Sequence, residues 1–186
     1  MSSRDDFPRR LALGAAAGLA GTVLLQALRA VNQRVAPRTM PPIRHDPGPF
    51  MVERAEGALP EGLRRRIPEG VESAASRGLG VGYGLTFGAL YAALRPRGGP
   101  ALADGVALGL ATWAAGYLGW LPALGLMPPV WRQHAGQVAL PVAQHAAFGV
   151  ATVAAYDALR RASGAVAPHD RPGAPSSRTI AASSAT

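Results

Sequence analysis

Four polar side chains near the start of the last apolar segment have types and spacing that could do chemistry. His134 and His145 are eleven residues apart, close to three helical turns, so one helix containing both would place them on the same side, with Gln137 and Gln144 nearby. An ionisable side chain inside an apolar helix is a candidate for proton transfer or for binding a polar ligand. The competing interpretation is hydrogen bonding between helices, with His134 in the preceding loop. Gln144 and His145 are therefore the candidate polar or ligand site.

No other pattern in the sequence supports an enzyme. Asp104 and Asp157 lie near the ends of apolar segments, and Asp157 has Arg160 and Arg161 within one turn, so local pairing explains these aspartates. The chain has no cysteine, which excludes disulfides, thiolate metal sites and cysteine nucleophiles. The sequence motifs of zinc proteases, serine hydrolases, P-loop nucleotide binders and EF-hands do not occur. We expect no enzymatic activity, no cofactor and no metal.

These polar residues lie within or beside long apolar blocks, which dominate the sequence. Apolar residues form continuous stretches in place of the mixed spacing of a soluble amphipathic helix. The four blocks cover residues 11–28, 78–94, 101–121 and 138–156. At 1.5 Å per residue, a helix of this length spans or approaches a bilayer core of about 30 Å. The sequence predicts an all-α protein built as a four-helix transmembrane bundle.

The remaining segments complete the predicted organisation. Residues 1–10 form a cytoplasmic N-terminal segment, residues 11–161 the membrane domain, and residues 162–186, which are small and polar with several prolines, a disordered tail. Within the long first connection, prolines predict an extended stretch up to residue 49. Helical patterns at 50–58 and 61–67 fit short helices at the membrane interface. This connection is either a partner-binding platform or a solvated connector that rests on headgroups.

Two other interpretations of the apolar blocks compete with this one. Pro8, Arg9 and Arg10 precede an Ala/Gly/Leu stretch in the manner of a twin-arginine export signal, but no A-x-A cleavage pattern follows between Leu24 and Met40. Blocks of 17 to 21 residues could also be buried helices of a soluble all-α protein. Such a protein needs a charged stripe along each helix, and none of the four blocks has one. We therefore expect a retained multi-pass membrane protein.

An even number of crossings places both chain termini on the same side of the membrane. The positive-inside rule assigns arginine-rich short flanks to the cytoplasm, and only Arg132 lies in the short connection between the third and fourth blocks. The rule predicts that both termini are cytoplasmic. The long connection 31–77 opposes this orientation, because it holds eight arginines. The flanking arginines on the predicted cytoplasmic side are Arg9, Arg10, Arg95, Arg97, Arg160 and Arg161.

The formal net charge of +8 invites a comparison with nucleic-acid-binding proteins. All basic residues are arginines, and they sit beside apolar blocks or in the tails, with no basic face interleaved with aromatic residues. That placement suits anionic lipid headgroups better than a nucleic-acid backbone. The predicted partners are the lipid bilayer and a membrane protein, and not a nucleic acid.

Glycines spaced four residues apart are the most specific packing signal. G-x-x-x-G spacing lets two helix backbones approach closely. A nucleotide-binding loop would need a preceding strand and the order G-x-G-x-x-G, and the glycine run from Gly78 to Gly84 has neither. The predicted helix-packing residues are Gly14, Gly18, Gly80, Gly84, Gly88, Gly105 and Gly109.

Aromatic residues near the block ends are typical of an interfacial belt. Trp120 and Trp131 flank a proline turn, and Tyr91 and Tyr156 lie near the opposite ends of their blocks. The loop 121–130 is unusually apolar for a solvated connection. It is expected either to dip into the bilayer or to pack over the mouth of the bundle.

Short motifs along residues 11–161 resemble a known family. They are Gly82-Tyr83-Gly84, Gly88-Ala89-Leu90-Tyr91, Leu124-Gly125-Leu126-Met127-Pro128-Pro129, and Tyr156-Asp157 before a basic end. Together they resemble the YagU-like family of bacterial inner-membrane proteins of unknown function. The resemblance implies a four-span inner-membrane protein, with a link to acid tolerance proposed for one branch and no established catalytic residues.

Two functions are compatible with these features. The first is a non-enzymatic bundle in a bacterial inner membrane that forms a homo-oligomer or binds another membrane protein. The alternative is a small transporter or proton-conducting protein that uses Gln144 and His145. Because four spans are few for a transporter, the alternative also requires oligomers.

Overall fold

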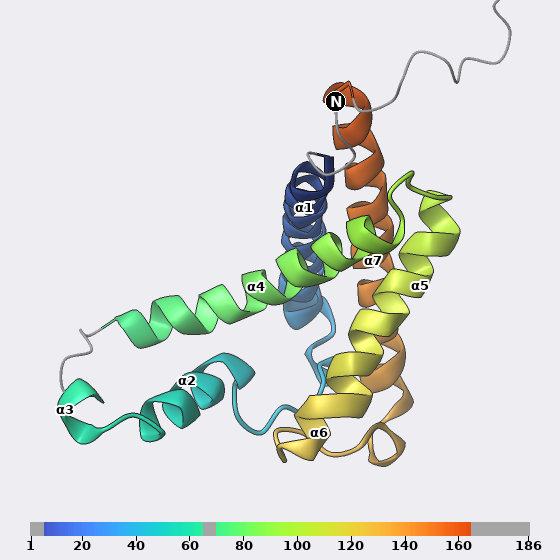
Figure 1. The fold of residues 1–186 in the computed structure, drawn as a ribbon. Coiled ribbons are helices and arrows are strands. Elements are labelled where there is room, and N and C mark those ends of the chain that lie inside the picture. Colours follow the sequence, from blue (N-terminus) through green and yellow to red (C-terminus); the bar gives the residue numbers. More distant parts are fainter. Residues whose placement is uncertain (1–5, 65–69, 165–186) are drawn as a thin grey trace, which may run out of the picture.

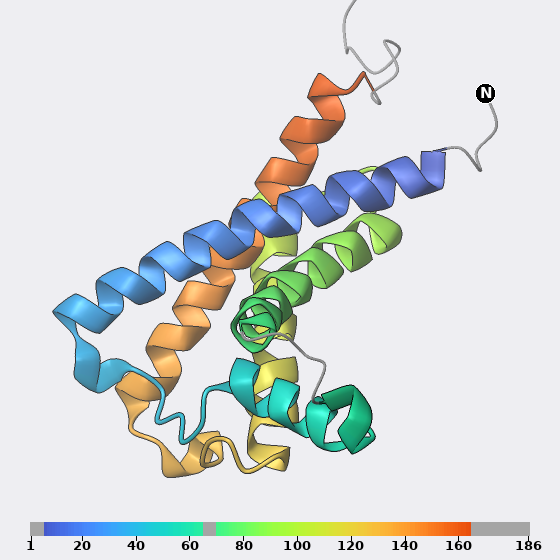
Figure 2. The ribbon, with the colours of Figure 1, turned by 90° about the vertical axis from the view of Figure 1, so that its left-hand side faces the viewer.

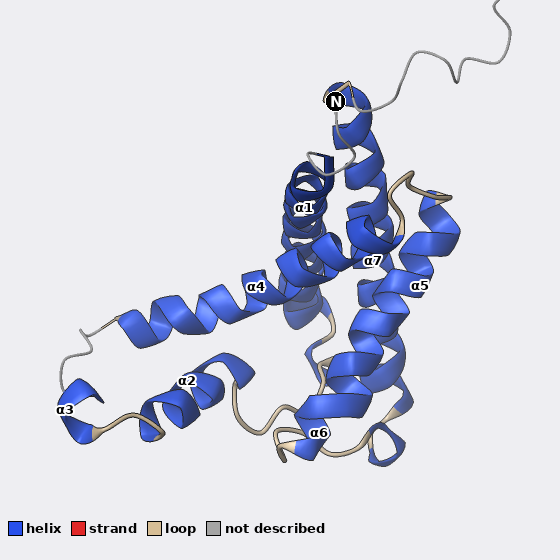
Figure 3. Ribbon diagram, in the orientation of Figure 1, coloured by secondary structure: helices blue, strands red, loops and turns tan. Residues whose placement is uncertain are grey.

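The computed structural model describes residues 6–64 and 70–164, and every regular element in these ranges is helical (Figure 3). The long helices are α1 (Asp6–Val35), α4 (Val71–Leu94), α5 (Ala101–Ala114) and α7 (Ala135–Ala162). The predicted all-α class is therefore confirmed for the part of the chain that is described. The predicted N-terminal segment up to residue 5 and the tail from residue 165 lie outside it.

Three helical segments are long and apolar enough to cross a membrane. They are Phe7–Val35, Ala101–Ala123 and Ala135–Ala162. The apolar part of α4, Gly78–Leu94, is shorter. The described residues thus contain three helices of spanning length and composition beside one shorter apolar helix.

The helices extend beyond the apolar blocks that indicated them. Helix α1 runs for 30 residues and includes Val31–Val35, which the sequence placed in an extended stretch. That expectation was wrong because the first proline of the connection is Pro37, so nothing before it prevents helix continuation. Helix α7 begins at Ala135, three residues before the predicted block 138–156, so Pro141 lies in the helix interior.

The four long helices lie in the spatial order α4, α1, α7, α5 (Figures 1 and 2). Helices α1 and α7 form the central pair, α4 packs on α1, and α5 packs on α7. No large apolar side chain of α7 is exposed, although the whole helix is described. In contrast, α1, α4 and α5 expose leucines and valines such as Val23, Leu94 and Leu102.

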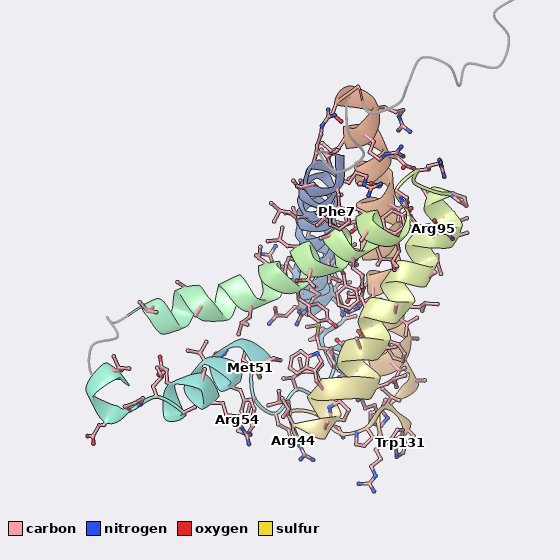
Figure 4. All side chains as sticks on the ribbon, in the orientation of Figure 1. Phe7, Arg44, Met51, Arg54, Arg95 and Trp131 are labelled. Atoms are coloured by element: carbon pink, nitrogen blue, oxygen red, sulfur yellow. The ribbon has the colours of Figure 1, made fainter. Side chains whose placement is uncertain are left out.

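The bundle has two distinct ends, named here after residues in their connections. The Gly98 end holds the start of α1, the α4–α5 turn and the last turns of α7, and Figure 4 labels Phe7 and Arg95 there. The Pro128 end holds the start of α7 and the end of α5, with Arg44 and Trp131 nearby (Figure 4). The chain therefore returns to the Gly98 end after each pair of long helices.

Helix α5 is followed directly by two further helical segments. It continues as a π-helical segment, Ala115–Trp120, and then as α6, Leu121–Ala123, with non-helical φ and ψ of −95° and −109° at Gly119. The predicted block 101–121 ends directly before Pro122. Proline disturbs the preceding turn, because it lacks an N–H and its ring crowds the carbonyl four residues earlier, so the distortion appears at the flexible Gly119.

The apolar loop after α6 folds over the Pro128 end. Leu126 and Met127 are buried against Tyr117 and Leu121, and the Leu126 carbonyl accepts a hydrogen bond of 2.8 Å from the Arg44 backbone N–H. Of the two arrangements expected for this loop, packing over the bundle mouth is the one observed.

The first connection carries the short helices η1 (Pro37–Thr39), α2 (Pro47–Gly57) and α3 (Glu61–Arg64). Asp46 caps α2 by accepting a hydrogen bond from the Gly48 N–H, and Pro47 follows at the first helical position. Helix α2, which carries Met51 and Arg54, lies beside the half of α4 that projects from the bundle (Figures 1 and 4). The predicted helix at 61–67 is described only to residue 64.

Candidate functional site

Glycines bring α1 and α4 into backbone contact. A Cβ atom at Gly18 would lie within 3.0 Å of the Gly84 carbonyl, and one at Gly88 would lie as close to the Gly14 carbonyl. Real Cβ atoms essentially never approach so closely, so these positions accept only glycine at this helix separation. The hydroxyl of Thr22 fills the space beside Gly84 and donates to the Gly18 carbonyl at 2.8 Å.

Gly80 does not belong to this contact. A Cβ there would have no atom within 4 Å. The N-terminal half of α4, which contains Gly80, projects away from α1 (Figure 1). The three-glycine ridge that the sequence indicated on α4 is therefore a two-glycine contact, made by Gly84 and Gly88.

The remaining predicted glycines face α7. Cβ atoms at Gly105 and Gly109 would meet the α7 backbone at Val150 and His145 within 3.0 Å. Two glycines that the sequence analysis missed complete the contacts: Gly149 of α7 lies on the Gly105 carbonyl, and Gly21 of α1 lies on Thr152 and the Phe148 carbonyl. The only signal for Gly149 was a lone glycine in an apolar block, without a second glycine four residues away.

The predicted polar pair is packed inside the bundle. Gln144 is buried, and His145 places its Nδ1 at 2.8 Å from the Pro141 carbonyl, one turn earlier in the same helix. The His145 ring also meets Tyr117 edge-on, with ring centroids 5.5 Å apart. Because His145 forms this hydrogen bond with the Pro141 carbonyl of its own helix, local packing accounts for a histidine at this position.

His134 is separated from this pair. It is exposed and stands at the N-cap of α7, where its backbone N–H donates to the Gln137 side-chain oxygen at 3.1 Å. This hydrogen bond satisfies a helix-terminal group, as capping interactions do. The proposed histidine stripe is therefore divided between a helix cap and the bundle interior.

We expect purified protein in liposomes containing a pH-sensitive dye to show no proton flux above that of empty liposomes. The hydrogen bond of His145 stays within its own helical turn and does not continue to another ionisable side chain among the described residues. The His145→Ala variant should accordingly match the wild type. Flux in the wild type that this variant removes would contradict the expectation and favour the proton-conducting alternative.

A charged and aromatic network occupies the Gly98 end. Asp104, at the start of α5, accepts hydrogen bonds from the Arg95 guanidinium at 3.1 Å and from the Tyr91 hydroxyl at 3.2 Å. The Tyr91 ring meets the Tyr156 ring of α7 edge-on, with centroids 5.6 Å apart. The network therefore joins α4, α5 and α7.

The α7 side of the network contains a second ion pair. Arg160 lies 3.9 Å from Asp157 and 5.7 Å from the centroid of the Tyr156 ring, and the turn at Gly98 covers both charged groups. Helix α1 joins through Arg9, which donates to the Ser163 carbonyl. The structure thus brings residues from all four long helices to one end of the bundle.

Tyr91 and Tyr156 were expected to be interface anchors. That interpretation was wrong, because both side chains are buried between helices, 5% and 0% exposed respectively. Trp131, in contrast, is exposed at the Pro128 end (Figure 4). Apart from arginines at the block ends, no pattern in the sequence indicated the tyrosine network, since its members come from four separate helices.

Comparison with protein-family models, with curated protein sequences and with solved structures finds no significant match to the chain. The resemblance to the YagU-like family therefore stays a prediction. Among the described residues, no group of histidine, aspartate or glutamate side chains is placed to hold a metal ion.

Proposed function

We propose that the chain is a non-enzymatic, multi-pass protein of a bacterial inner membrane, in which α1, α4, the α5–α6 segment and α7 each cross the bilayer. The observation that carries the proposal is the low degree of burial of the apolar helices. Only 28%, 28% and 33% of the three long apolar windows is buried within the chain. A water-soluble bundle would bury such faces, whereas lipid tails cover them at no cost.

The shorter apolar part of α4 is compatible with a fourth crossing. Its 17 residues, Gly78–Leu94, correspond to about 26 Å of helix, at the lower edge of the range for a span. The helix continues back to Val71, so its backbone hydrogen bonds need not end inside the bilayer. Its C-terminus lies at the Gly98 end, as alternate crossings require. This pattern, together with the family resemblance, supports a four-span arrangement.

Three buried threonine hydroxyls of the helices are hydrogen-bonded without water. Thr22, Thr112 and Thr152 each donate to the carbonyl four residues earlier, at 2.7 to 2.9 Å. A hydroxyl without a partner is costly in hydrocarbon, and this local bond satisfies it without water.

We further propose that the protein associates with a second copy of itself through α4. The Gly82 face consists of Gly78, Gly82 and Thr86, spaced one turn apart. Cβ atoms at Gly78 and Gly82 would meet no atom within 4 Å, and Thr86 is exposed. Because small residues in a span permit close approach of a second helix, a neighbouring α4 fits this face. A different membrane protein is the alternative occupant.

Crosslinking in native membranes tests this assembly. We expect the wild type to give a dimer of two identical chains and Gly82→Leu to reduce that dimer at least about tenfold, because a leucine keeps the neighbouring helix away from the α4 backbone. The fold should survive, since the space at Gly82 is open.

Gly80→Leu is the matched control, because Gly80 lies on the same helix, also faces open space and points away from the Gly82 face. It should crosslink like the wild type. Equal dimer yields in Gly82→Leu and the wild type would remove the Gly82 face from the assembly. A wild-type adduct with another protein in place of the dimer would favour the alternative occupant.

A further inference from the structure

Two buried hydrogen-bond donors at the Gly98 end have no partner among the described residues. One is Nε of Arg10, on α1, and the other is the hydroxyl of Tyr156, on α7. Tyr156 is fully buried, whereas Arg10 is partly exposed and connects the interior with the surface. A buried donor without an acceptor costs about 1 to 3 kcal/mol, so two such donors in one region indicate that an acceptor binds there.

The two carboxylates whose side chains are described near this site are already engaged. Asp104 accepts from Arg95 and Tyr91, and Asp157 pairs with Arg160. These aspartates therefore do not supply the acceptor for Arg10 and Tyr156.

The surroundings of the Tyr156 hydroxyl are cationic. Arg160 lies 5.7 Å from the centre of its ring, and Arg10 lies one helical turn before Leu13, which packs against the buried cluster that contains Tyr156. Arg9, Arg10, Arg95 and Arg160 outnumber the two aspartates whose side chains are described in this region, Asp104 and Asp157. A bridging water could accept from both donors but would leave this excess of positive charge. An anion would accept from both donors and would also balance the positive charge.

We propose that Arg10, Tyr156 and Arg160 bind a phosphate group, supplied by the headgroup of an anionic phospholipid. Guanidinium groups match the oxygens of a phosphate in geometry and charge, and a phosphodiester offers acceptors to more than one donor. The site lies where the helices end, beside the Gly98 turn, which is the level of lipid headgroups if the helices cross the bilayer. In this respect the inference rests on the proposed membrane location.

The test measures lipid binding to the full chain in maltoside detergent, which contains no phosphate. Native mass spectrometry would count bound phosphatidylglycerol, and tryptophan fluorescence would follow the thermal midpoint. We expect phosphatidylglycerol to bind and to raise the midpoint, and diacylglycerol, which lacks the phosphate, to do neither. Arg10→Gln should weaken phosphatidylglycerol binding at least about tenfold, because it removes a charge-assisted hydrogen bond.

Arg161→Gln is the control, because Arg161 is an exposed arginine next to Arg160 at the same end of the bundle. It should bind phosphatidylglycerol like the wild type, and equal losses in both variants would overturn the site. Binding of diacylglycerol as strong as that of phosphatidylglycerol would also overturn it. Stabilisation by inorganic phosphate with no effect of phosphatidylglycerol would overturn the assignment to a lipid.

Tyr156→Phe keeps the test decisive if Arg10→Gln fails to fold. Phenylalanine preserves the ring contacts, and removing an unpartnered hydroxyl should leave the lipid-free midpoint equal to or above that of the wild type. Phosphatidylglycerol binding should still weaken. A lower lipid-free midpoint would show that the hydroxyl has an internal partner and would overturn the proposal. Failure of lipid binding would leave the crosslinking result unaffected, because the Gly82 face lies apart from this site.

Discussion

Replacing Gly18 with leucine is expected to lower the free energy of unfolding by about 3 kcal/mol or more, the upper range for overpacking a close contact. The new Cβ would overlap the Gly84 carbonyl and approach the Gly88 Cα to 3.2 Å. These are backbone atoms, which cannot rotate away as a side chain can, so α1 and α4 must separate along their whole contact. The measurement is the thermal midpoint in detergent, with the yield of monodisperse protein as a second readout.

Gly80→Leu is the matched comparison for this variant, because it adds the same side chain to an α4 position with no atom within 4 Å. It should unfold at the wild-type temperature or slightly above, since leucine has a higher helix propensity than glycine. Equal destabilisation by the two substitutions would mean that the α1–α4 contact is not made through Gly18.

Reporter fusions should separate the two ends of the bundle completely. Fusions after Pro96 and after Ser163 are expected to report from the cytoplasm, because both positions lie at the Gly98 end with the flanking arginines. Fusions near Gly57 and Arg132 are expected to report from outside. Two reporters, one active only in the cytoplasm and the other active only outside it, would measure each position twice.

Two outcomes of the fusion series would contradict this orientation in different ways. A cytoplasmic signal near Gly57, with the other three positions as expected, would mean that α4 does not cross, because Gly57 and Pro96 lie on either side of it. The eight arginines of the connection 31–77 would then lie in the cytoplasm, in agreement with the positive-inside rule. External signals at all four positions, with a mature chain that begins beyond Ala30, would establish the twin-arginine export signal.

Helix ends that prolines determine could be predicted, while ends set by polar residues could not. Helix α4 ends at Leu94 before Pro96, and α5 begins at Ala101 directly after Pro100. Helix α1, however, runs past its apolar block to Val35. Hydropathy identifies the part of a helix that prefers lipid, whereas arginine and glutamine extend the helix itself at little cost.

The glycine contacts show what spacing reveals and what it leaves open. The spacing of Gly84 and Gly88 indicated a close helix contact, but Gly80 has the same spacing and meets nothing. Two crossing helices touch over only a few turns, so the crossing point decides which glycines are used. The crossing point depends on the partner helix, and a single segment carries no information about it.

The network at the Gly98 end could not be predicted for a related reason. Asp104 is paired with Arg95 across a turn, which local spacing suggests, but the neighbours of Tyr156 come from α1 and α4 as well as α7. Only the order of helices in space brings them together.

The spatial order of the helices has a consequence for biosynthesis. A ribosome delivers α1, α4 and α5 before α7, and α5 packs on α7 while making only weak contact with α4. Until α7 emerges, α1 and α4 can pair, but α5 lacks its packing partner, and Gly105 and Gly109 remain uncovered. Insertion of α7 joins the early pair to the waiting helix in one step, so a nascent chain stalled before α7 would present a glycine-lined helix to any other membrane protein within reach.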